Sequence, residues 1–319
     1  MAGNYLKLSL LFCILSQILT VNSYSQASTM IDSLENVIRN AREDTSLVNN
    51  LNILTFYYYA RIDDYETAMQ YADSSIALAG KLGFLTGKGK AQLNKAKIIF
   101  NLGNYPEALN FNQAALESYL QTSDKLGIAN AYNNIGLTYR YLDNYPEAMK
   151  YCSLALEIYE EIGSKKGQAN AYDNMGAIYQ DQYQWEESAK MYFHSLKINE
   201  EIGDQNGIAG RYNNLGIVYD AMGNYQEALD LYMKVIQIDK ELGNKYNLAI
   251  AYNNIAAIYI KQEKYPESLK MFLESLNISK EIGDTVGMID QYINIGWLYS
   301  LEKKYPEAES SYNSALWLP

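Results

Sequence analysis

The residues able to do catalytic chemistry are few and isolated. His194 is the only histidine, and we interpret it as a surface or edge residue rather than a catalytic base or metal ligand. Cys152 stands where other parts of the chain carry an aromatic or small core residue, and it is predicted to be inert. The sequence has no Cys/His cluster with metal-ligand spacing and no glycine-rich phosphate loop. It therefore predicts a chain that is not an enzyme and has neither metal nor cofactor.

A different chemistry, that of the carboxamide, recurs at intervals of forty residues. An asparagine offers one acceptor oxygen and two N–H donors, which match the C=O and N–H of an extended peptide backbone. At 100° per residue along a helix, this position lies opposite the apolar residues of its segment, so it is predicted to be exposed. The main row consists of Asn94, Asn134, Asn174, Asn214, Asn254 and Asn294, with Leu54 in the first copy. A second row, one residue earlier, consists of Asn133, Asp173, Asn213 and Asn253.

The elements that must position these rows follow from the forty-residue repeat itself. Within residues 131–170, apolar residues recur at helical spacing in two runs, 132–139 and 145–155, separated by a short turn. Each repeat is therefore predicted to form two amphipathic helices. Successive blocks begin, without insertion or deletion, at Leu51, Ala91, Ala131, Ala171, Arg211, Ala251 and Gln291.

Prolines, glycines and small residues mark the ends and contacts of the predicted helices. A proline followed by glutamate fits the first turn of the second helix, where no hydrogen bond is lost and a carboxylate suits the helix dipole. Four prolines fall there, namely Pro106, Pro146, Pro266 and Pro306. Glycines in the left-handed C-cap position are expected at Gly163, Gly203, Gly243 and Gly283. Close approach of the paired helix is expected at Ala96, Gly136, Gly176, Gly216, Ala256 and Gly296.

The 31 tyrosines recur at helical spacing, so we interpret most of them as core packing residues rather than as a stacking platform or cofactor site. The first such position holds Tyr132, Tyr172, Tyr212, Tyr252 and Tyr292. The second holds Tyr139, Tyr179, Tyr219, Tyr259 and Tyr299. The third holds Tyr65, Tyr105, Tyr145, Tyr225, Tyr265 and Tyr305, with Trp185 in one repeat.

The order Tyr-x-x-Ile/Leu-Gly-x-x-Tyr, then Tyr-x-x-Ala, then an aromatic and a small residue resembles the tetratricopeptide repeat. The forty-residue spacing with its Asn-Asn pair resembles the longer variant of kinesin light chains and Pins/LGN scaffold proteins. This resemblance implies an all-α fold, an α-α superhelical solenoid of tandem helix pairs. It covers residues 51–319, six full repeats and an incomplete seventh. The first repeat is atypical, with Phe56 at the small-residue position, and a helix within residues 29–42 is expected to help it cap the stack.

The resemblance also implies a place for the asparagine rows, since the first helices of tetratricopeptide folds line a concave surface where asparagines hold bound peptides. Six hydrogen bonds supply roughly 3–9 kcal/mol, whereas association costs about 4–15 kcal/mol, so neighbouring side chains must add specificity. The neighbours are Arg140, Tyr141, Gln180, Asp181, Asp220 and Lys261. No lysine–arginine clamp for a C-terminal carboxylate is present. In the alternative, each asparagine bonds to the next repeat and only fixes the stacking.

The first 25 residues differ from the rest of the chain and predict a secretory signal peptide. MAGNYLK carries one lysine, LSLLFCILSQILTV is an apolar stretch of fourteen residues, and small residues follow. Ser23 and Ser25 fit a small-x-small site, which places cleavage before Gln26. Cys13 is not expected to carry a lipid, because bulky Phe12 precedes it. We therefore expect an exported protein, periplasmic or otherwise extracytoplasmic, with a helical cap at residues 26–50 before the solenoid.

The net charge and the C-terminal sequence limit the kinds of partner that we expect. A formal net charge of −11 repels phosphate backbones, which argues against nucleic acid as a partner. After the signal peptide, no apolar run is long enough to span a membrane. The seventh repeat ends in SSYNSALWLP, so Trp317 and Leu318 are expected to leave apolar surface on which another chain could stack end to end.

The whole arrangement resembles the exported sensory half of bacterial signalling proteins that continue into a histidine kinase, a transcriptional regulator or a cyclase. On this interpretation residues 1–319 are a fragment or a short version of a longer protein. Two classes of function remain open at this point. The chain is either a protein- or peptide-binding module that feeds a signalling output, or a structural scaffold with no peptide ligand.

Overall fold

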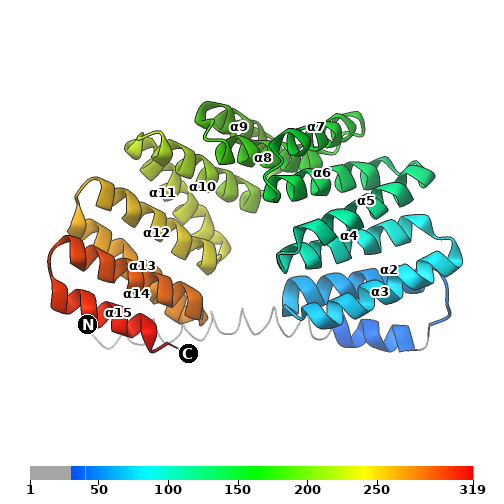
Figure 1. The fold of residues 1–319 in the computed structure, drawn as a ribbon, viewed down its shortest axis with the longest axis horizontal. Helices are drawn as coiled ribbons and strands as arrows, with labels where there is room; N and C mark the ends of the chain where they lie inside the picture. Colours follow the sequence, from blue (N-terminus) through cyan, green and yellow to red (C-terminus); the bar gives the residue numbers. More distant parts are fainter. Residues whose placement is uncertain (1–29, 40, 319) are drawn as a thin grey trace. The chain divides into compact units, whose positions relative to one another are not determined.

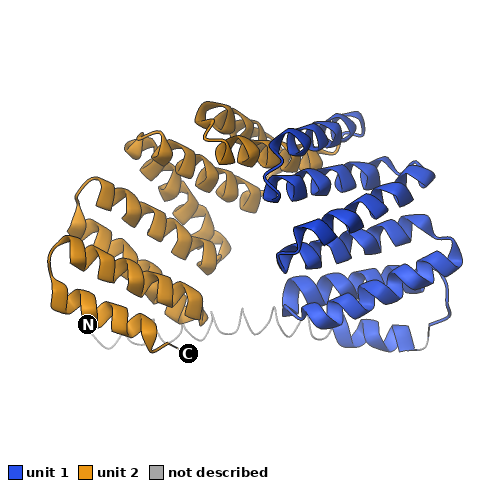
Figure 2. Ribbon diagram, viewed as in Figure 1, with its two compact units in different colours: residues 1–163 blue, residues 164–319 orange. Residues whose placement is uncertain are grey.

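The computed structural model describes residues 30–39 and 41–318, and the predicted signal peptide at residues 1–25 lies outside them. The described residues form helices joined by short turns, and no strand occurs among them. This confirms the all-α prediction. Helices that follow one another along the chain lie side by side (Figure 1). The chain divides into two compact units, residues 1–163 and 164–319, which are described separately (Figure 2).

Among its described residues, the first unit contains a helix at residues 30–39 followed by three helix pairs. Each pair joins a first helix to an antiparallel second helix, and within the unit each second helix also contacts the first helix that follows it. The elements are α2 (Thr45–Tyr57) with the π-helical turn η1 (Tyr58–Ile62), α3 (Tyr65–Leu82), α4 (Leu85–Asn101), α5 (Tyr105–Thr122), α6 (Lys125–Tyr141) and α7 (Tyr145–Glu161).

The second unit repeats this arrangement in four helix pairs. Its elements are α8 (Lys165–Asp181), α9 (Trp185–Ile202), α10 (Gln205–Ala221), α11 (Tyr225–Leu242), α12 (Lys245–Lys261), α13 (Tyr265–Ile282), α14 (Thr285–Leu301) and α15 (Tyr305–Leu316). None of the helices among the described residues combines the length and apolarity needed to cross a membrane.

The predicted helix ends are confirmed. The four proline-containing second helices, α5, α7, α13 and α15, carry the proline at their N-terminus. Asn104 and Asn144 cap α5 and α7, each accepting a hydrogen bond at 3.4 Å from the backbone N–H of the glutamate three residues on. Second helices end in a left-handed residue, as at Gly203 with φ 70°. Ser123 takes that position after α5, with φ 55°.

The small residues of the first helices do allow close approach of the second helices. A Cβ added to Gly176 would lie 2.8 Å from the ring of Tyr192, and one added to Gly216 would lie 2.7 Å from Tyr232. At Gly136 it would lie 2.6 Å from Sγ of Cys152. In these pairs the missing side chain of the glycine makes room for a residue of the second helix, a tyrosine at Gly176 and Gly216 and Cys152 at Gly136.

The tyrosines predicted to form the core are mostly half-buried instead. Every member of the three predicted positions keeps some solvent contact, and Tyr305 is 65% exposed. The fully buried tyrosines lie elsewhere on the second helices, at Tyr119, Tyr159, Tyr192 and Tyr232. The reason is geometric: a single layer of helix pairs has a thin core, so a phenol at its margin buries the ring but reaches solvent with its hydroxyl.

The atypical first repeat is joined to the helix at residues 30–39 through one carboxylate. The hydroxyls of Tyr58 and Tyr71 donate to Glu35 Oε1 at 2.8 and 3.0 Å. The bond from Tyr58 is the main reason why the pKa of Glu35 is lowered. Phe56, which replaces the usual small residue, is 46% exposed and precedes the π-helical turn η1.

Candidate functional site

The asparagine row of the second unit forms hydrogen bonds between successive repeats. The side-chain N–H of Asn214 donates to Asp173 Oδ1 at 3.1 Å. Asn254 donates to Asn213 Oδ1 at 3.2 Å, and Asn294 donates to Asn253 Oδ1 at 3.0 Å. Each bond joins the main row to the second row forty-one positions earlier. The two rows that the sequence singled out are thus brought together into one ladder across the first helices.

In the first unit the same row is less regular. Asn94 donates to the backbone carbonyl of Asn52 at 3.2 Å, because the first repeat has no second-row side chain there. Asn134 lines a hollow between α4 and α6. Asn133 lies on α6 and Asn174 on α8 of the second unit, and both are half-buried. All six residues of the main row are half-buried rather than exposed. Four of them, Asn94, Asn214, Asn254 and Asn294, direct the amide toward the preceding repeat.

Some of the other predicted site residues contact one another. Lys261 pairs with both oxygens of Asp220 at 2.7 and 2.8 Å, which links α12 to α10. Gln180 accepts a hydrogen bond from the Tyr192 hydroxyl at 3.0 Å, and this bond links α8 to α9. The Arg140 guanidinium lies 5.3 Å from the ring of Tyr141, which is 46% exposed. Asp181 is half-buried at the end of α8.

A hollow of about 230 Å³ opens beside the asparagine row in the first unit. Its floor is Asn112, which is 3% exposed and donates to Thr138 Oγ1 at 3.2 Å, while its own Oδ1 has no partner among the described residues. Lys97 also lines the hollow and reaches solvent. Desolvation by the surrounding protein lowers the pKa of its ammonium group. This hollow is therefore cationic and offers one unused acceptor.

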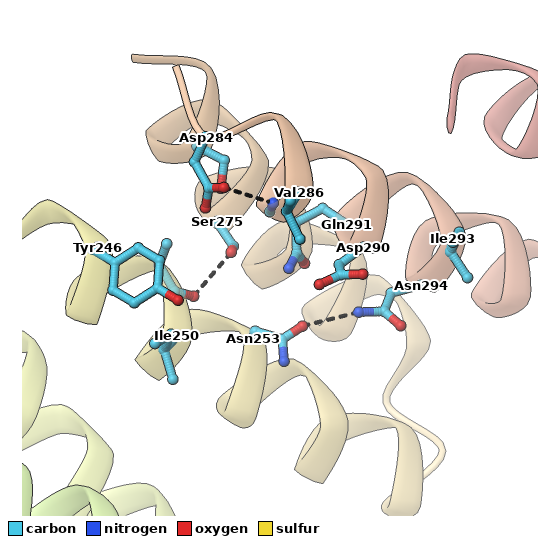
Figure 3. Close-up of a pocket in the computed structure, with 13 residues that line it drawn as sticks. Tyr246, Ile250, Asn253, Ser275, Asp284, Val286, Asp290, Gln291, Ile293 and Asn294 are labelled. Carbon is cyan, nitrogen blue, oxygen red and sulfur yellow. Dashed lines mark hydrogen bonds between the residues drawn. The ribbon is translucent and has the colours of Figure 1, made fainter. Parts of the chain in front are cut away.

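The second unit has a hollow of about 280 Å³ between α12 and α14, above α13 (Figure 3). Two rungs of the ladder, Asn253 and Asn294, line it. Gln291 lies at its centre and is 6% exposed, and its Oε1 has no partner in the described part of the chain. The only charged side chains of the lining are acidic, Asp284 and Asp290, and the first of these caps α14 by accepting the Gly287 N–H at 2.9 Å. This hollow is therefore acidic.

Neither reactive side chain of the sequence forms a catalytic arrangement. Cys152 is buried, and burial raises the pKa of its thiol to about 12, which keeps it protonated and unreactive. His194 is exposed and stacks on the ring of Tyr172 with 5.0 Å between ring centres. Across residues 30–39 and 41–318, no group of three acidic, histidine or cysteine side chains could hold a metal ion.

Sequence reasoning missed Lys97, Asn112, Asp290 and Gln291, although three of them carried a signal. Lys97 stands where the repeats that follow carry Leu137, Ala177, Ile217, Ala257 and Trp297. Gln291 stands where four of the other blocks begin with alanine. In a repeat protein, a polar residue at an otherwise apolar position identifies a place where one repeat differs from its neighbours. Asn112 likewise stands where the other repeats carry Ala72, Cys152, Tyr192, Tyr232, Phe272 and Tyr312. Asp290 carries no such signal, because its position varies from repeat to repeat.

Comparison with known proteins agrees with this architecture. The family model described as "Tetratricopeptide repeat" matches residues 89–161, 167–241 and 247–316. No curated protein sequence matches the chain. A signal transduction ATPase with a tetratricopeptide repeat sensor from Pyrococcus horikoshii aligns with a TM-score of 0.69 at 18% identity, over 93% of this chain and 48% of that one. This chain thus spans about half the length of that protein.

Two bacterial structures align over nearly their whole lengths. A Rap protein complexed with competence and sporulation factor has a TM-score of 0.66 at 15% identity, over 95% of both chains. The quorum sensor NprR from B. thuringiensis, in its apo form, has a TM-score of 0.59 at 16% identity, over 95% of this chain and 97% of that one. At these identities the likeness shows a shared fold.

Proposed function

This chain belongs to the tetratricopeptide repeat family, and we propose that it is a non-catalytic module that binds a protein or an extended peptide along its asparagine ladder. One observation carries the proposal. In the second unit Asn214, Asn254 and Asn294 each use one side-chain N–H for the bond to the preceding repeat. These bonds do not use their carboxamide oxygens or second N–H groups, and Asn294 lies with Asn253 in the lining of the hollow. Such a row can pair with the backbone of an extended peptide.

The structural relatives support a signalling role for this binding. One relative is a Rap protein complexed with a factor, one is a quorum sensor, and one carries a tetratricopeptide repeat sensor. We propose that the chain is exported and serves as the sensory or interaction part of a bacterial signalling protein, of histidine kinase or transcriptional regulator type. The N-terminal MAGNYLK, apolar stretch and small residues support export.

The scaffold alternative has its own observation in its favour. The three bonds of 3.0–3.2 Å between successive repeats show that the ladder stabilises the stack whether or not a ligand is present. In this alternative the row needs no ligand, and the exposed Trp317, 84% accessible, supports end-to-end stacking on another chain.

Selection of peptides from a displayed random library, followed by measurement of their affinities, separates these two functions. The test variant carries Asn134→Ala, Asn174→Ala, Asn214→Ala and Asn254→Ala. The matched control carries four exposed substitutions on second helices, Gln121→Ala, Glu157→Ala, Gln237→Ala and Glu274→Ala. Circular dichroism and thermal melts must first show that both remain folded.

A binding module predicts enriched peptides that bind the parent and the control alike and lose about tenfold or more in affinity for the row variant, since two lost hydrogen bonds suffice for that. Failure to enrich any peptide, or equal affinity for both variants, would favour the scaffold. Export is tested separately: N-terminal sequencing of the secreted protein should begin at Gln26, and retention of the intact N-terminus in the cytoplasm would contradict it.

A further inference from the structure

The hollow of the second unit contains a buried acceptor without a donor. Gln291 is 6% exposed, and its Oε1 has no hydrogen-bond partner in the described residues. Burying such an oxygen unpaired is unfavourable, so a donor that reaches it would gain a hydrogen bond. Asp290, exposed at the rim, has no basic partner among the lining residues. The hollow thus calls for a ligand that donates hydrogen bonds and carries positive charge.

The second unit itself shows what fits this place, because the corresponding space between α8 and α10 is filled by an arginine. Arg211 lies eighty residues, two repeats of forty, before Gln291. Its Nε lies 2.9 Å from Asp173 Oδ1, and its Nη1 donates to Ser195 Oγ at 3.3 Å. A guanidinium therefore fits between two successive first helices, with the second helix beneath it.

The surroundings of the two places match on the second helix, whereas Asp173, the partner of Arg211, is replaced by the neutral Asn253. Ser195 donates to the carbonyl of Ala169 at 2.8 Å, and its counterpart Ser275 donates to the carbonyl of Ala249 at 2.9 Å. Ser275 and Ala249 both line the hollow. The floor that receives the guanidinium of Arg211 is thus present between α12 and α14, where the chain's own residue is the shorter, neutral Gln291.

Two other residues that differ favour a guanidinium supplied by a ligand. Asp290 replaces Gly210, so a carboxylate stands at the rim of the hollow. Tyr246 replaces Lys166 and is 60% exposed, which provides a ring face on which a planar cation can stack. An anionic ligand would be repelled by Asp284 and Asp290, and an apolar one would leave Oε1 of Gln291 unpaired.

We propose that this hollow is a subsite for an arginine side chain of the bound protein or peptide. The proposal rests on the proposed binding function and adds the chemistry of one ligand residue to it. The guanidinium donates to Gln291 Oε1 and pairs with Asp290, and its aliphatic stem lies against Ile250 and Val286 at the rim. Arginine suits the subsite better than lysine, since its planar fork of five donors can reach both acceptors at once.

The subsite can be probed without a full peptide ligand. The probe is N-acetyl-arginine N-methylamide, titrated into the ¹⁵N-labelled full chain while the side-chain amide of Gln291 is followed by NMR. The matched probe is the citrulline compound, which has nearly the same shape and no charge. We expect saturable shifts with a dissociation constant on the order of 1 mM for the arginine compound. Because charge-assisted hydrogen bonds are the stronger ones, the citrulline compound should bind about tenfold more weakly.

Variants locate the binding. Gln291→Arg fills the hollow from within, as Arg211 does between α8 and α10, and should abolish saturable binding. Asp290→Asn should weaken it about two- to fivefold, the range of an exposed ion pair. Asp230→Asn, an equal charge change at an exposed position of α11, should leave it unchanged.

The outcomes separate this proposal from the proposed function. The arginine subsite would be overturned if the two probes bound with equal affinity. It would also be overturned if no saturable shift occurred at about fifty times the expected dissociation constant, or if a folded Gln291→Arg variant bound the arginine compound as tightly as the parent. Peptide binding along the ladder would still stand if the library selection succeeds. Conversely, arginine binding in the hollow together with a failed selection would retain the subsite and discard the peptide groove.

Discussion

Tyr119 in the first unit and Ser279 in the second occupy the same repeat position, 160 residues or four repeats of forty apart. Tyr119 is 5% exposed, and its ring packs so closely on α6 that a Cβ at Gly127 would lie 2.2 Å from it. Ser279 stands beneath Gly287 and lines the acidic hollow. The same backbone arrangement therefore gives a filled junction in one unit and a hollow in the other.

The difference shows that side-chain size at a few repeat positions decides where a solenoid can receive a ligand. Tyr119 packs with Leu93, Ala115 and Ala131 in an apolar cluster. In the second unit the counterparts of Tyr119 are polar, namely Asn199, Asp239 and Ser279, and all three are buried. The polar junctions cost stability where their hydrogen bonds are incomplete, so the second unit has less apolar packing at these positions than the first has at Tyr119.

Removing the tyrosine from the filled junction should have the largest effect. Tyr119→Ala should lower the free energy of unfolding of the first unit by about 3–5 kcal/mol, since a buried aromatic side chain is lost and a cavity remains. Hydrogen exchange of α5 and α6 amides during denaturant titration measures this. Tyr105→Ala, a half-buried tyrosine of the same helix, is the control and should cost clearly less. Equal losses would mean that burial does not distinguish the two tyrosines.

A second prediction compares Arg211 with Gln291, which hold the same position in the second unit. Arg211→Ala should destabilise the second unit by about 2 kcal/mol, because it leaves the half-buried Asp173 without its cation. Gln291→Ala should change stability by less than about 0.5 kcal/mol, since its Oε1 has no bond to lose. Chemical denaturation of the two variants at equal salt measures the contrast. Comparable losses would show that Gln291 is already satisfied.

The stability of the second unit should depend on pH through the buried carboxyl group of Asp239. Burial raises the pKa of this carboxyl above 3.8, and hydrogen bonds from Asn244 and Asn247 offset this only in part. The folded state therefore binds the proton more tightly than the unfolded chain, so the carboxylate destabilises the protein above the raised pKa. Lowering the pH through that pKa toward 3.8 relieves the penalty.

Asp239→Asn should accordingly stabilise the second unit at neutral pH by about 1–2 kcal/mol, because Oδ2 of the carboxylate has no partner in the described residues. Asn199 shows that an amide fits, since its Nδ2 donates to the carbonyl of Ser195 four residues earlier at 2.9 Å. Denaturation at neutral pH and near pH 4 measures the gain and its decrease. A gain that is independent of pH would refute the assignment to the Asp239 charge.

The smallest effect concerns the turns between paired helices, where one residue is left-handed in every repeat. Tyr183 holds this conformation with φ 59°, and in the next repeat Gly223 holds it with φ 79°. Tyr183→Gly should stabilise the protein by up to about 1 kcal/mol, whereas Gly223→Ala should destabilise it by a similar amount. Thermal melts of the two single variants provide the measurement. Changes of the same sign would show that the turn conformation does not limit stability at these positions.

The helix pairs could be predicted from the sequence because the signals that specify them are local. Pro146 and Gly203 mark helix ends by their own backbone preferences, and both predictions were correct. The asparagine rows could also be found in the sequence, since the same residue type recurs at a fixed interval of forty residues. Their pairing, from Asn254 to Asn213, could not be predicted, because it depends on how two repeats lie against each other.

The sequence alone thus determined the all-helical fold, the forty-residue repeat and the family, since periodicity and helix caps act within a few residues. The tertiary structure decided which tyrosines are buried and where space remains. The acidic hollow is lined by side chains from α12, α13 and α14, and its volume depends on the sizes of Ser275, Ser279 and Gln291 together. No single position carries that information, because close packing is a property of residues that meet only after the helices have paired.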